Sequence, residues 1–576
     1  MKKRNLMLQT VGCIAVAFLF LVPLCRLVLM SFTQDDGSFS FGNYTVLLQE
    51  PRTLRAIGNT VIISLAATAL STVLGVLFAF IVAYLNVRRK KLLELLVLAP
   101  FIIPSYVITI SWTSALAGNS GMNQLLRLLH LGPVNLYSLG GIIFILGICN
   151  IPLVYLTTVN ILRKIPRDLE WAARASGCGQ WKTLFRINLR QAAPAIIGGS
   201  VLAFLSCIDN FSVPAFLGIP ASIPVLSTYI YEKAISFGSQ SFSMASALSV
   251  MLSVVAIAGS LGISAFSQKE KQADSIRADF SERIILKNRT RRWVEWISIG
   301  IFAVIDLVPL LTMTAASFQD LYGQSFSVKN FSLQNYQFLF TNSGISSAVG
   351  NSLMLSLITC AVCILVGTAA AYQKLHGSGP AVRLLEACAS LTYAIPGIVL
   401  ALAMIFHWSA IPGVYGSIQI LMVSYVTRYL ILQVKGSSAA MLSIHPSLEE
   451  AAHVSGSGNV RMWKRILIPL LFRQTISSSL LIFVSALTEM TLSSILASTG
   501  TKTIGLSVFN LQQSGDYNLA YAFSVLIVLL IVCGYALVQY VCREPVKKGK
   551  CEKRQNAGLF RQYPFKVSHK MEESAL

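Results

Sequence analysis

Residues 169–190, LEWAARASGCGQWKTLFRINLR, and residues 448–469, LEEAAHVSGSGNVRMWKRILIP, are two copies of one segment. They align without a gap at an offset of 279 and share nine residues. Each copy is polar, contains small residues at its centre and lies between long apolar stretches. This pattern indicates a membrane protein with two equivalent docking elements on a water-exposed face.

The composition places the chain among membrane proteins. Hydrophobic residues make up 54% and charged residues 12% of the 576 residues, and the mean hydropathy is +0.65, outside the range of ordinary soluble proteins. Apolar stretches of about 20 residues can cross the hydrocarbon core of a bilayer. We therefore predict an all-α polytopic membrane protein with about twelve spans, at 11–32, 57–85, 92–117, 138–160, 194–218, 243–266, 293–318, 348–373, 384–409, 414–433, 475–497 and 519–542.

The basic residues predict the orientation. Of the 46 Lys and Arg, 38 lie at the termini or in predicted loops on the side of the repeated segments, and six lie in the opposite loops. Under the positive-inside rule, both termini and both repeated loops are cytosolic. The net charge of +22 is explained mostly by this orientation. We expect membrane lipid as a partner and no nucleic acid.

The repeat extends beyond the two loops. The first apolar segment resembles a signal peptide, but its LVPL motif at 21–24 recurs at 307–310, so we expect a retained span. Further pairs at an offset of 292 are Gly75 and Gly367, Glu94 and Glu386, and Pro104 and Pro396. The offset then falls to 279, which predicts about thirteen additional residues near 118–137. Each half has an even number of spans, so the halves are parallel six-helix repeats.

These boundaries divide the chain into four parts. The first half is 1–266 with its repeated loop at 163–192, and the second half is 293–542 with its loop at 444–472. The linker 267–292 is polar and charged, as expected of a cytosolic tether. The basic tail 543–576 is predicted to be solvated, with contact to anionic lipid as the alternative.

Each repeated loop predicts a helix, a glycine turn and a second helix. Glu170 and Glu449 lie near the start of the first helix, where the helix dipole stabilises an acid. Gly177 and Gly456 permit a backbone reversal, or a close approach that a side chain would block. The second helical stretches are 180–189 and 459–468. Such a unit on a membrane face can act as a lever for a partner; the alternative is an ordinary amphipathic loop.

The loop sequence resembles a known signature. Glu-Ala-Ala, three residues, Gly, then nine residues and Ile-x-Leu-Pro is typical of permease subunits of ATP-binding-cassette importers. The chain resembles a fused pair of such permease halves (type I) over nearly its whole length. The second copy keeps Glu449, Ala451, Ala452, Gly456, Ile466 and Pro469, and the first keeps Glu170, Ala172, Ala173, Gly177 and Ile187. Arg190 stands where proline is usual, which leaves the end of the first loop open.

The resemblance implies partners. In this family each loop forms a coupling helix that sits in a groove of one cytosolic ATPase subunit, and an extracytoplasmic binding protein delivers the substrate. We therefore expect two ATP-binding-cassette subunits as partners. No GxxxxGK[ST] phosphate-binding loop is present in the sequence, so we expect no cofactor on this chain, no enzymatic activity, and ATP binding by the partner. The implied docking residues are Glu170, Ala172, Ala173, Gly177, Glu449, Ala451, Ala452 and Gly456.

Ionisable groups inside predicted spans are functional candidates because they are costly in a bilayer. Asp209 and Asn210 lie in the span after the first loop, and Glu489 aligns with Asn210 at the 279 offset. They line a transport pathway that tolerates a cation, or they are a hydrogen-bonded polar pair that holds two helices together; the sequence leaves both open. Three residues without counterparts are expected to have structural or interfacial roles, namely Asp306, Arg428 and His407.

The substrate is less well defined. The stretches DNFSVPAFLGIP at 209–220 and TIGLSVFNLQQSGDYNLAYAFSVL at 503–526 resemble fused permeases for ferric iron. Relatives that carry thiamine, polyamines or aminoalkylphosphonates are alternatives. We find no metal-ligand cluster, and Cys360-x-x-Cys363 lies within an apolar span where packing is expected. A secondary transporter of the major facilitator class is a more remote alternative, because it has shorter repeats and lacks the loop signature.

Overall fold

The computed structural model describes residues 2–541 except 35, 36, 119, 129, 131, 132, 237, 239, 266–278, 321–329 and 378. These residues form helices joined by short connections, and their only β structure is three isolated bridges. The predicted tail 543–576 and the beginning of the predicted linker lie outside the described residues. The all-α fold is confirmed.

The first half begins with α1 (Lys2–Val16), a π-helical turn (Ala17–Leu21) and α2 (Val22–Ser31), which together form one candidate span. The elements that follow are α3 (Gly42–Gln49), α4 (Pro51–Tyr84), α5 (Lys90–Ile102), α6 (Ser105–Ala115), α7 (Gly121–Leu128), α8 (Leu139–Leu162), α9 (Arg167–Ala175), α10 (Gln180–Thr183), a π-helical turn (Leu184–Asn188), α11 (Leu189–Asp209), α12 (Ser212–Leu217), α13 (Leu226–Ile235) and α14 (Ser241–Ala265).

The second half repeats this order, with the exception of α7, which lies in the predicted insertion near 118–137. Its elements are α15 (Asn288–Phe302), a π-helical turn (Ala303–Leu307), α16 (Val308–Ser317), α17 (Gln334–Thr341), α18 (Ser343–Leu375), α19 (Pro380–Ala394), α20 (Gly397–Trp408), α21 (Ile418–Leu442), α22 (Ser447–Val454), α23 (Asn459–Met462), a π-helical turn (Trp463–Leu467), α24 (Ile468–Leu487), α25 (Thr491–Leu496), α26 (Ile504–Gln513) and α27 (Tyr517–Val541).

The candidate spans follow the duplication. Among the described residues, nine helices are long and apolar enough to cross a membrane, and two bent helix pairs raise the number to eleven. The one predicted span that is not among these candidates, 414–433, corresponds to α21, a helix of 25 residues that contains Arg428 and Lys435. Its counterpart in the first half is α8.

Two of the predicted spans are bent, which the sequence analysis did not anticipate. The span predicted at 92–117 is the pair α5 and α6, bent by 104°, and the span predicted at 384–409 is the pair α19 and α20, bent by 118°. Pro104 and Pro396 lie at the two bends and precede α6 and α20. Proline has no N–H to donate and disfavours helical geometry in the residue before it, so each span stops and restarts in a new direction.

Two further predicted spans, 194–218 and 475–497, are also interrupted. The long helix ends at Asp209 in one and at Leu487 in the other, and each is followed by a helix of six residues, α12 or α25. The polar candidates of the sequence analysis lie at these interruptions. Backbone breaks at membrane depth are tolerated where protein surrounds them or where they line a cavity.

The first span of each half packs against the bent third span of the other half. Arg26 of α2 donates to the carbonyl oxygen of Phe406 in α20 at 3.1 Å. In the other direction, Trp112 of α6 donates to the carbonyl oxygen of Ile305 at 3.2 Å. The two halves are therefore intertwined.

Two of the unmatched ionisable residues lie at these exchanged contacts. His407 of α20 is buried, and its ring lies 4.5 Å from that of Phe18 in the first span. Asp306 is buried in the π-helical turn that packs near Trp112. Both positions agree with the expected interfacial roles.

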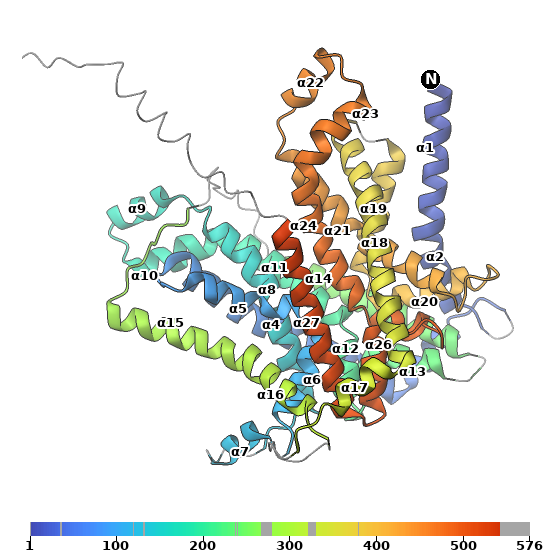
Figure 1. Ribbon diagram of the computed structural model, residues 1–576, viewed down its shortest axis with the longest axis horizontal. Helices are drawn as coiled ribbons and strands as arrows, with labels where there is room; N and C mark the ends of the chain where they lie inside the picture. Colours follow the sequence, from blue (N-terminus) through green and yellow to red (C-terminus); the bar gives the residue numbers. More distant parts are fainter. Residues whose placement is uncertain are drawn as a thin grey trace, which may run out of the picture.

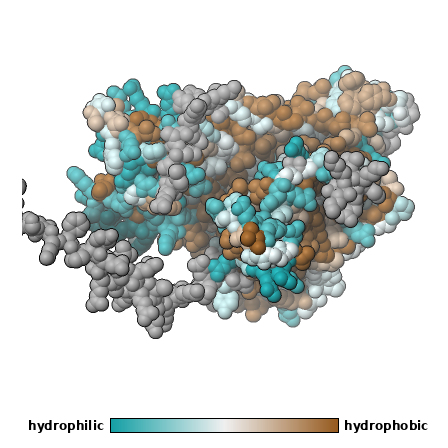
Figure 2. Space-filling view, turned by 90° about the horizontal axis from the view of Figure 1, so that it is seen from above, coloured by the Kyte–Doolittle hydropathy of each residue, from teal (hydrophilic) through white to brown (hydrophobic). Residues whose placement is uncertain are grey.

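The two loop helices α9 and α22 lie at separate corners of the molecule (Figure 1). We call the side that carries them the loop face. Seen from the side of α22, hydrophilic residues gather over the loop regions, and hydrophobic surface covers much of the remainder (Figure 2).

Candidate functional site

The two repeated loops have the same backbone. The helix α9 ends before Gly177, which has φ +83°, and α22 ends before Gly456, which has φ +74°. The amide of Cys178 donates to the carbonyl of Ala173 at 3.0 Å, and the matching amide in the second loop makes the same bond at 3.0 Å. This is the glycine-dependent helix end in which a left-handed residue satisfies the last carbonyls. The predicted reversal at both glycines is confirmed.

The stretches after the glycine turns also match. In each loop a short helix, α10 or α23, is followed by a π-helical turn that leads into α11 or α24. The turn forms in the second loop, where Pro469 follows it, and equally in the first, where Arg190 takes the place of proline. Proline is therefore not required for this geometry, and the first loop has the same backbone form as the second up to its end.

Both loops expose apolar side chains. In the first loop Trp171, Trp181 and Phe185 are 59–62% exposed, and in the second Val454 and Val460 are 89% and 81% exposed. Large apolar groups gathered on an otherwise hydrophilic face are typical of a surface that a partner covers. Side chains of this kind were not among the predicted docking residues.

Apart from the two glutamates, the predicted docking residues divide into two sets. Gly177, Gly456 and the first alanine of each pair, Ala172 and Ala451, are exposed. The second alanine of each pair, Ala173 or Ala452, is buried against the chain's own fold. Only the exposed set is accessible to a partner in this conformation.

The two loop glutamates are bonded within the chain. Glu170 accepts from the side-chain amide of Asn188 at 2.5 Å and from the guanidinium of Arg283. Glu449 accepts from the hydroxyl of Tyr372 at 3.3 Å and contacts Nε2 of His376 at 2.9 Å. Each glutamate therefore holds its loop to neighbouring segments, and its predicted role in docking stays a prediction.

A cavity of about 540 Å³ lies between the two halves and is lined by residues from both. The lining follows the internal symmetry: Phe101 and Tyr393 are counterparts at the 292 offset, and Ser206 and Ser485 at the 279 offset. All three predicted pathway residues contribute to it, and so does Arg428. The structure therefore brings together groups that are far apart in sequence.

Asp209 connects the first half to the second. One carboxylate oxygen accepts from Nη2 of Arg428 at 2.6 Å, and the other accepts from the backbone N–H of Gly397 at 2.6 Å. Gly397 is the first residue of α20, where the helix dipole and free N–H groups stabilise an anion. Arg428 also donates to the carbonyl of Ile395 at 3.3 Å and is 6% exposed.

Asn210 and Glu489 make equivalent bonds at equivalent breaks. The Asn210 side chain accepts from the amide of Val213 at 2.9 Å, and Glu489 accepts from the amide of Leu492 at 3.0 Å. The second carboxylate oxygen of Glu489 accepts from the hydroxyl of Tyr429. Each residue thus caps a short helix and also lines the cavity, and the two alternatives left open by the sequence, a transport pathway and a polar pair between helices, stay predictions.

A match to known proteins adds to this geometry. The family model described as "Binding-protein-dependent transport system inner membrane component" matches residues 71–271 and 363–544. The chain belongs to this family. It is an importer permease, a non-enzymatic transport subunit that crosses the inner membrane several times.

Two curated relatives of the permease match most of its length, and a third matches a shorter part. A ferric transport system permease protein of Actinobacillus pleuropneumoniae is 24% identical over 533 residues, which cover 90% of this chain and 76% of the relative. A probable ABC transporter permease protein of Sinorhizobium fredii is 22% identical, with 91% and 93% covered. A putative 2-aminoethylphosphonate permease of Salmonella typhimurium is 25% identical over 236 residues, 40% of this chain and 82% of the relative.

The charge inside the permease cavity is negative. Asp209 and Glu489 contribute two carboxylates and Arg428 one guanidinium. Donors within the chain already occupy oxygens of both carboxylates, so these groups set an electrostatic potential and do not form an open ligand set. Among the residues that the structure describes, no three His, Cys, Asp or Glu side chains cluster as a metal site would require.

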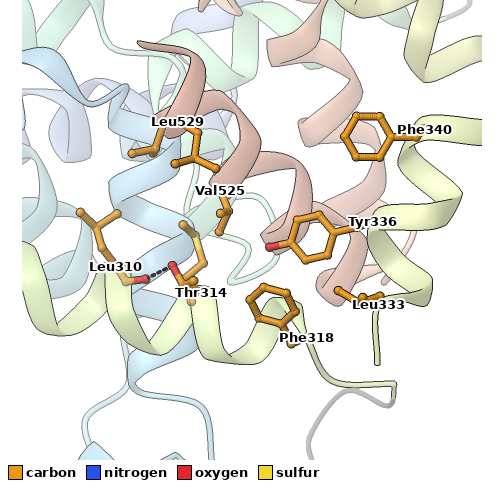
Figure 3. A pocket seen from close by; sticks show the side chains of 10 residues that line it. Leu310, Thr314, Phe318, Leu333, Tyr336, Phe340, Val525 and Leu529 are labelled. Atoms are coloured by element: carbon orange, nitrogen blue, oxygen red, sulfur yellow. Dashed lines mark hydrogen bonds between the residues drawn. The ribbon is translucent and has the colours of Figure 1, made fainter. Parts of the chain in front are cut away.

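A second cavity of the permease differs in character. It has a volume of about 480 Å³, lies between α16, α17 and α27, and is lined by apolar and aromatic side chains such as Leu310, Phe318 and Leu529 (Figure 3). The hydroxyl group of Thr314, which lines this cavity, donates a hydrogen bond to the carbonyl oxygen of Leu310 at 2.7 Å. Because the lining carries no charge and comes from the second half alone, it does not suit a polar cargo that moves between the halves.

Arg428, for which we expected a structural or interfacial role, also lines the cavity of the permease, which the sequence analysis did not predict. Its counterpart at the 279 offset is Cys149, and the counterpart of Asp209 is Thr488. Asp209 and Arg428 carry opposite charges, and neither has a charged counterpart in the other half. Because buried charges need partners, two such residues are candidates for pairing with each other. That signal is present in the sequence.

Proposed function

We propose that the permease is the membrane subunit of an ATP-driven importer for iron(III). The assignment of iron(III) as the substrate rests on the relative named for ferric transport, whose match covers 90% of this chain. The cavity supports a cationic cargo, because its two carboxylates outnumber its single guanidinium. The cargo passes through and needs no fixed ligand set.

The two loops bind two ATP-binding-cassette subunits, one subunit to each loop. The exposed apolar side chains, such as Trp181 and Val454, support this assignment because water is an unfavourable surrounding for them. ATP is bound by these partners, and the permease itself holds no cofactor. An extracytoplasmic binding protein delivers the cargo, the loop face is cytosolic, and both termini lie on that side.

Movement reaches the cavity along two continuous helices. The helix α11 runs from the first loop to Asp209 over 21 residues, about 30 Å at 1.5 Å per residue. The helix α24 runs from the second loop to Leu487, two residues before Glu489. Closure of the ATPase dimer draws the loops together, and these helices carry the displacement to the cavity residues. Alternating access follows from that displacement.

The test is uptake of labelled iron(III) in cells that lack this chain. The wild type is compared with the double variant Gly177→Asp and Gly456→Asp, and with Gly177→Asn and Gly456→Asn as a matched control. Asp and Asn have similar size and both tolerate positive φ, and a Cβ at either glycine meets nothing within 4 Å. We expect the Asp pair to lose uptake at least tenfold, because it places charge in the docking surface, with membrane levels unchanged.

Each outcome is informative. Loss of uptake in the deletion strain, rescued by wild type and not by the Asp pair, supports iron as cargo and the loops as coupling elements. Full uptake by the Asp pair contradicts the coupling role. If deletion leaves iron uptake unchanged while no second iron system is active, iron is wrong as the cargo. Aminoalkylphosphonate is then the second candidate, favoured by the Salmonella relative, and thiamine and polyamines follow.

A further inference from the structure

The described end of the predicted linker is bound to the first half. We call residues 279–286 the strap. The amide of Asp279 donates to the carbonyl of Arg163 at 2.7 Å, and the amides of Arg283 and Ile284 both donate to the carbonyl of Tyr84 at 3.0 Å. The strap thus lies across the loop-face ends of α4 and α8. This segment was expected to be a tether, and its backbone instead bridges to folded elements.

The side chain of Arg283 is the centre of this contact. It is 2% exposed, it pairs with Glu170, and its Nη2 donates to the carbonyl of Ile165 at 2.6 Å. Its guanidinium lies 4.6 Å from the ring centroid of Tyr84. A buried guanidinium is stable only when its donors are satisfied, and removal of one partner of a buried pair is strongly destabilising. The strap is therefore bound specifically.

A second contact holds the start of the loop helix α9. Nε of Arg167 donates to Asp279 at 2.7 Å, and Nη2 of the same guanidinium donates to the carbonyl of Glu282 at 3.0 Å. Arg167 is the first residue of α9 and Glu170 lies one turn further on. The strap therefore contacts the first turn of this helix at two residues, Arg167 and Glu170.

The second loop is held differently. Its glutamate, Glu449, is bonded to Tyr372 of α18 and to His376, which directly follows that helix, within its own half. His376 is the counterpart of Tyr84 at the 292 offset, and its side chain is 45% exposed. In the first loop the corresponding glutamate is instead bonded to a residue that belongs to the connection between the halves.

The strap also leads directly into the second half. Only Lys287 separates it from α15, which packs on α5 and continues into the span that lies against α6. A displacement of α9 that moves Arg283 therefore acts on the first span of the second half as well as on α11. The first loop has a mechanical connection to both halves, which the duplication alone does not provide.

We propose that the strap is a structural part of the first coupling loop and that Arg283 is its positioning residue, which couples movement of that loop to the second half. Only the effect of Arg283 on transport rests on the proposed function. The attachment itself is tested without transport. Its failure and the failure of the iron assignment are therefore distinguishable.

The first measurement is amide hydrogen exchange of the full chain in lipid nanodiscs, comparing 167–178 with the matched segment 446–457. Exchange reports local opening of such segments. We expect Arg283→Ala to speed exchange at least tenfold in 167–178 and leave 446–457 unchanged. His376→Ala should do the reverse. The matched control is Arg289→Ala, which removes an exposed cation of the same connecting region and should change neither segment.

Equal exchange in wild type and Arg283→Ala, or an equal increase in both segments, would overturn the proposal. If the alanine variant does not accumulate, Arg283→Lys takes its place: an ammonium can reach Glu170 but cannot reproduce the planar fork that also binds the Ile165 carbonyl. We expect about threefold faster exchange confined to 167–178, and unchanged exchange overturns the proposal here too.

The second measurement separates positioning from simple stability. With the ATPase partners present, Arg283→Ala should lower the cargo transported per ATP hydrolysed at least fivefold, at an unchanged half-saturating concentration of binding protein. Swapping the charges, Glu170→Arg with Arg283→Glu, should restore part of this ratio. A lowered yield of complex with a normal ratio would show that Arg283 only stabilises the fold.

Discussion

Asp209 of the first half and Arg428 of the second half form an ion pair of 2.6 Å at the wall of the cavity between them. The same carboxylate accepts from the amide of Gly397, so the end of α11 is joined to both α20 and α21. Because α11 begins at the first repeated loop, this pair is one place where a displacement of that loop would reach the other half. The pair is therefore a contact between halves that any rearrangement of the cavity has to alter.

Removing the charge of Asp209 should impair transport. Asp209→Asn leaves Arg428, which is 6% exposed, without its hydrogen-bonded counter-charge, and breaking a buried ion pair costs about 3 kcal/mol or more. We expect uptake to fall at least tenfold. The charge-swapped pair, Asp209→Arg with Arg428→Asp, should recover only part of it, because an arginine at 209 faces the N-terminus of α20. Full uptake by Asp209→Asn at normal membrane levels would contradict the role of this pair.

Glu489 allows the charge to be separated from the helix cap. Glu489→Gln keeps one oxygen that can accept from the amide of Leu492, and its NH2 group can donate to the Tyr429 hydroxyl, but it removes the negative charge; Glu489→Ala removes both the cap and the charge. If the charge serves transport, the glutamine variant should lose uptake about tenfold with a normal amount of protein in the membrane. The alanine variant should also reduce that amount, since loss of a cap costs about 1 kcal/mol. Normal uptake by Glu489→Gln would leave only the capping role.

The spans and the helix–turn–helix form of the repeated loops were predictable because their signals are local. Hydrophobic length marks a span wherever it occurs, and a glycine such as Gly177 marks a helix end through its own backbone freedom. Because the chain is duplicated, each signal occurs twice, at equivalent positions in the two halves. The position of α7 also followed, since an insertion in one copy changes the offset.

The bends, the contacts between halves and the strap were not predicted, because each depends on direction or on distant partners. Hydropathy counts the residues around Pro104 as one span and carries no information on the angle between α5 and α6. The pairing of Arg428 with Asp209 joins positions 219 residues apart. The strap is short and lies in a mostly polar, charged stretch at 267–292, so its sequence resembles a solvated connection, and only the buried site around Arg283 shows otherwise.

The end of the first loop should function equally well with arginine or with the proline that is usual in the family at position 190. The π-helical turn at Leu184–Asn188 matches the one at Trp463–Leu467 although only the second is followed by proline. We expect Arg190→Pro to keep uptake within about twofold of wild type. Ile187→Pro should abolish uptake, because it places proline inside the turn, where it removes an N–H and clashes with the preceding turn. A severe loss in Arg190→Pro would show that the arginine itself has a role in the loop.

The strap should stay bound in mild acid. Burial alone would raise the pKa of Asp279, but hydrogen bonds from Ser281 and Arg167 outweigh it and lower that pKa to about 2, from an ordinary value of 3.8. A carboxyl with a lowered pKa stabilises the folded state above its ordinary value and loses that contribution as the pH falls toward 2. Amide exchange over 279–286, corrected for its intrinsic pH dependence, should therefore be the same at pH 7 and pH 5. Asp279→Asn should speed it at both values, because Arg167 then lacks its counter-charge. Faster exchange in the wild type at pH 5, approaching that of Asp279→Asn, would show that another titrating group controls the attachment.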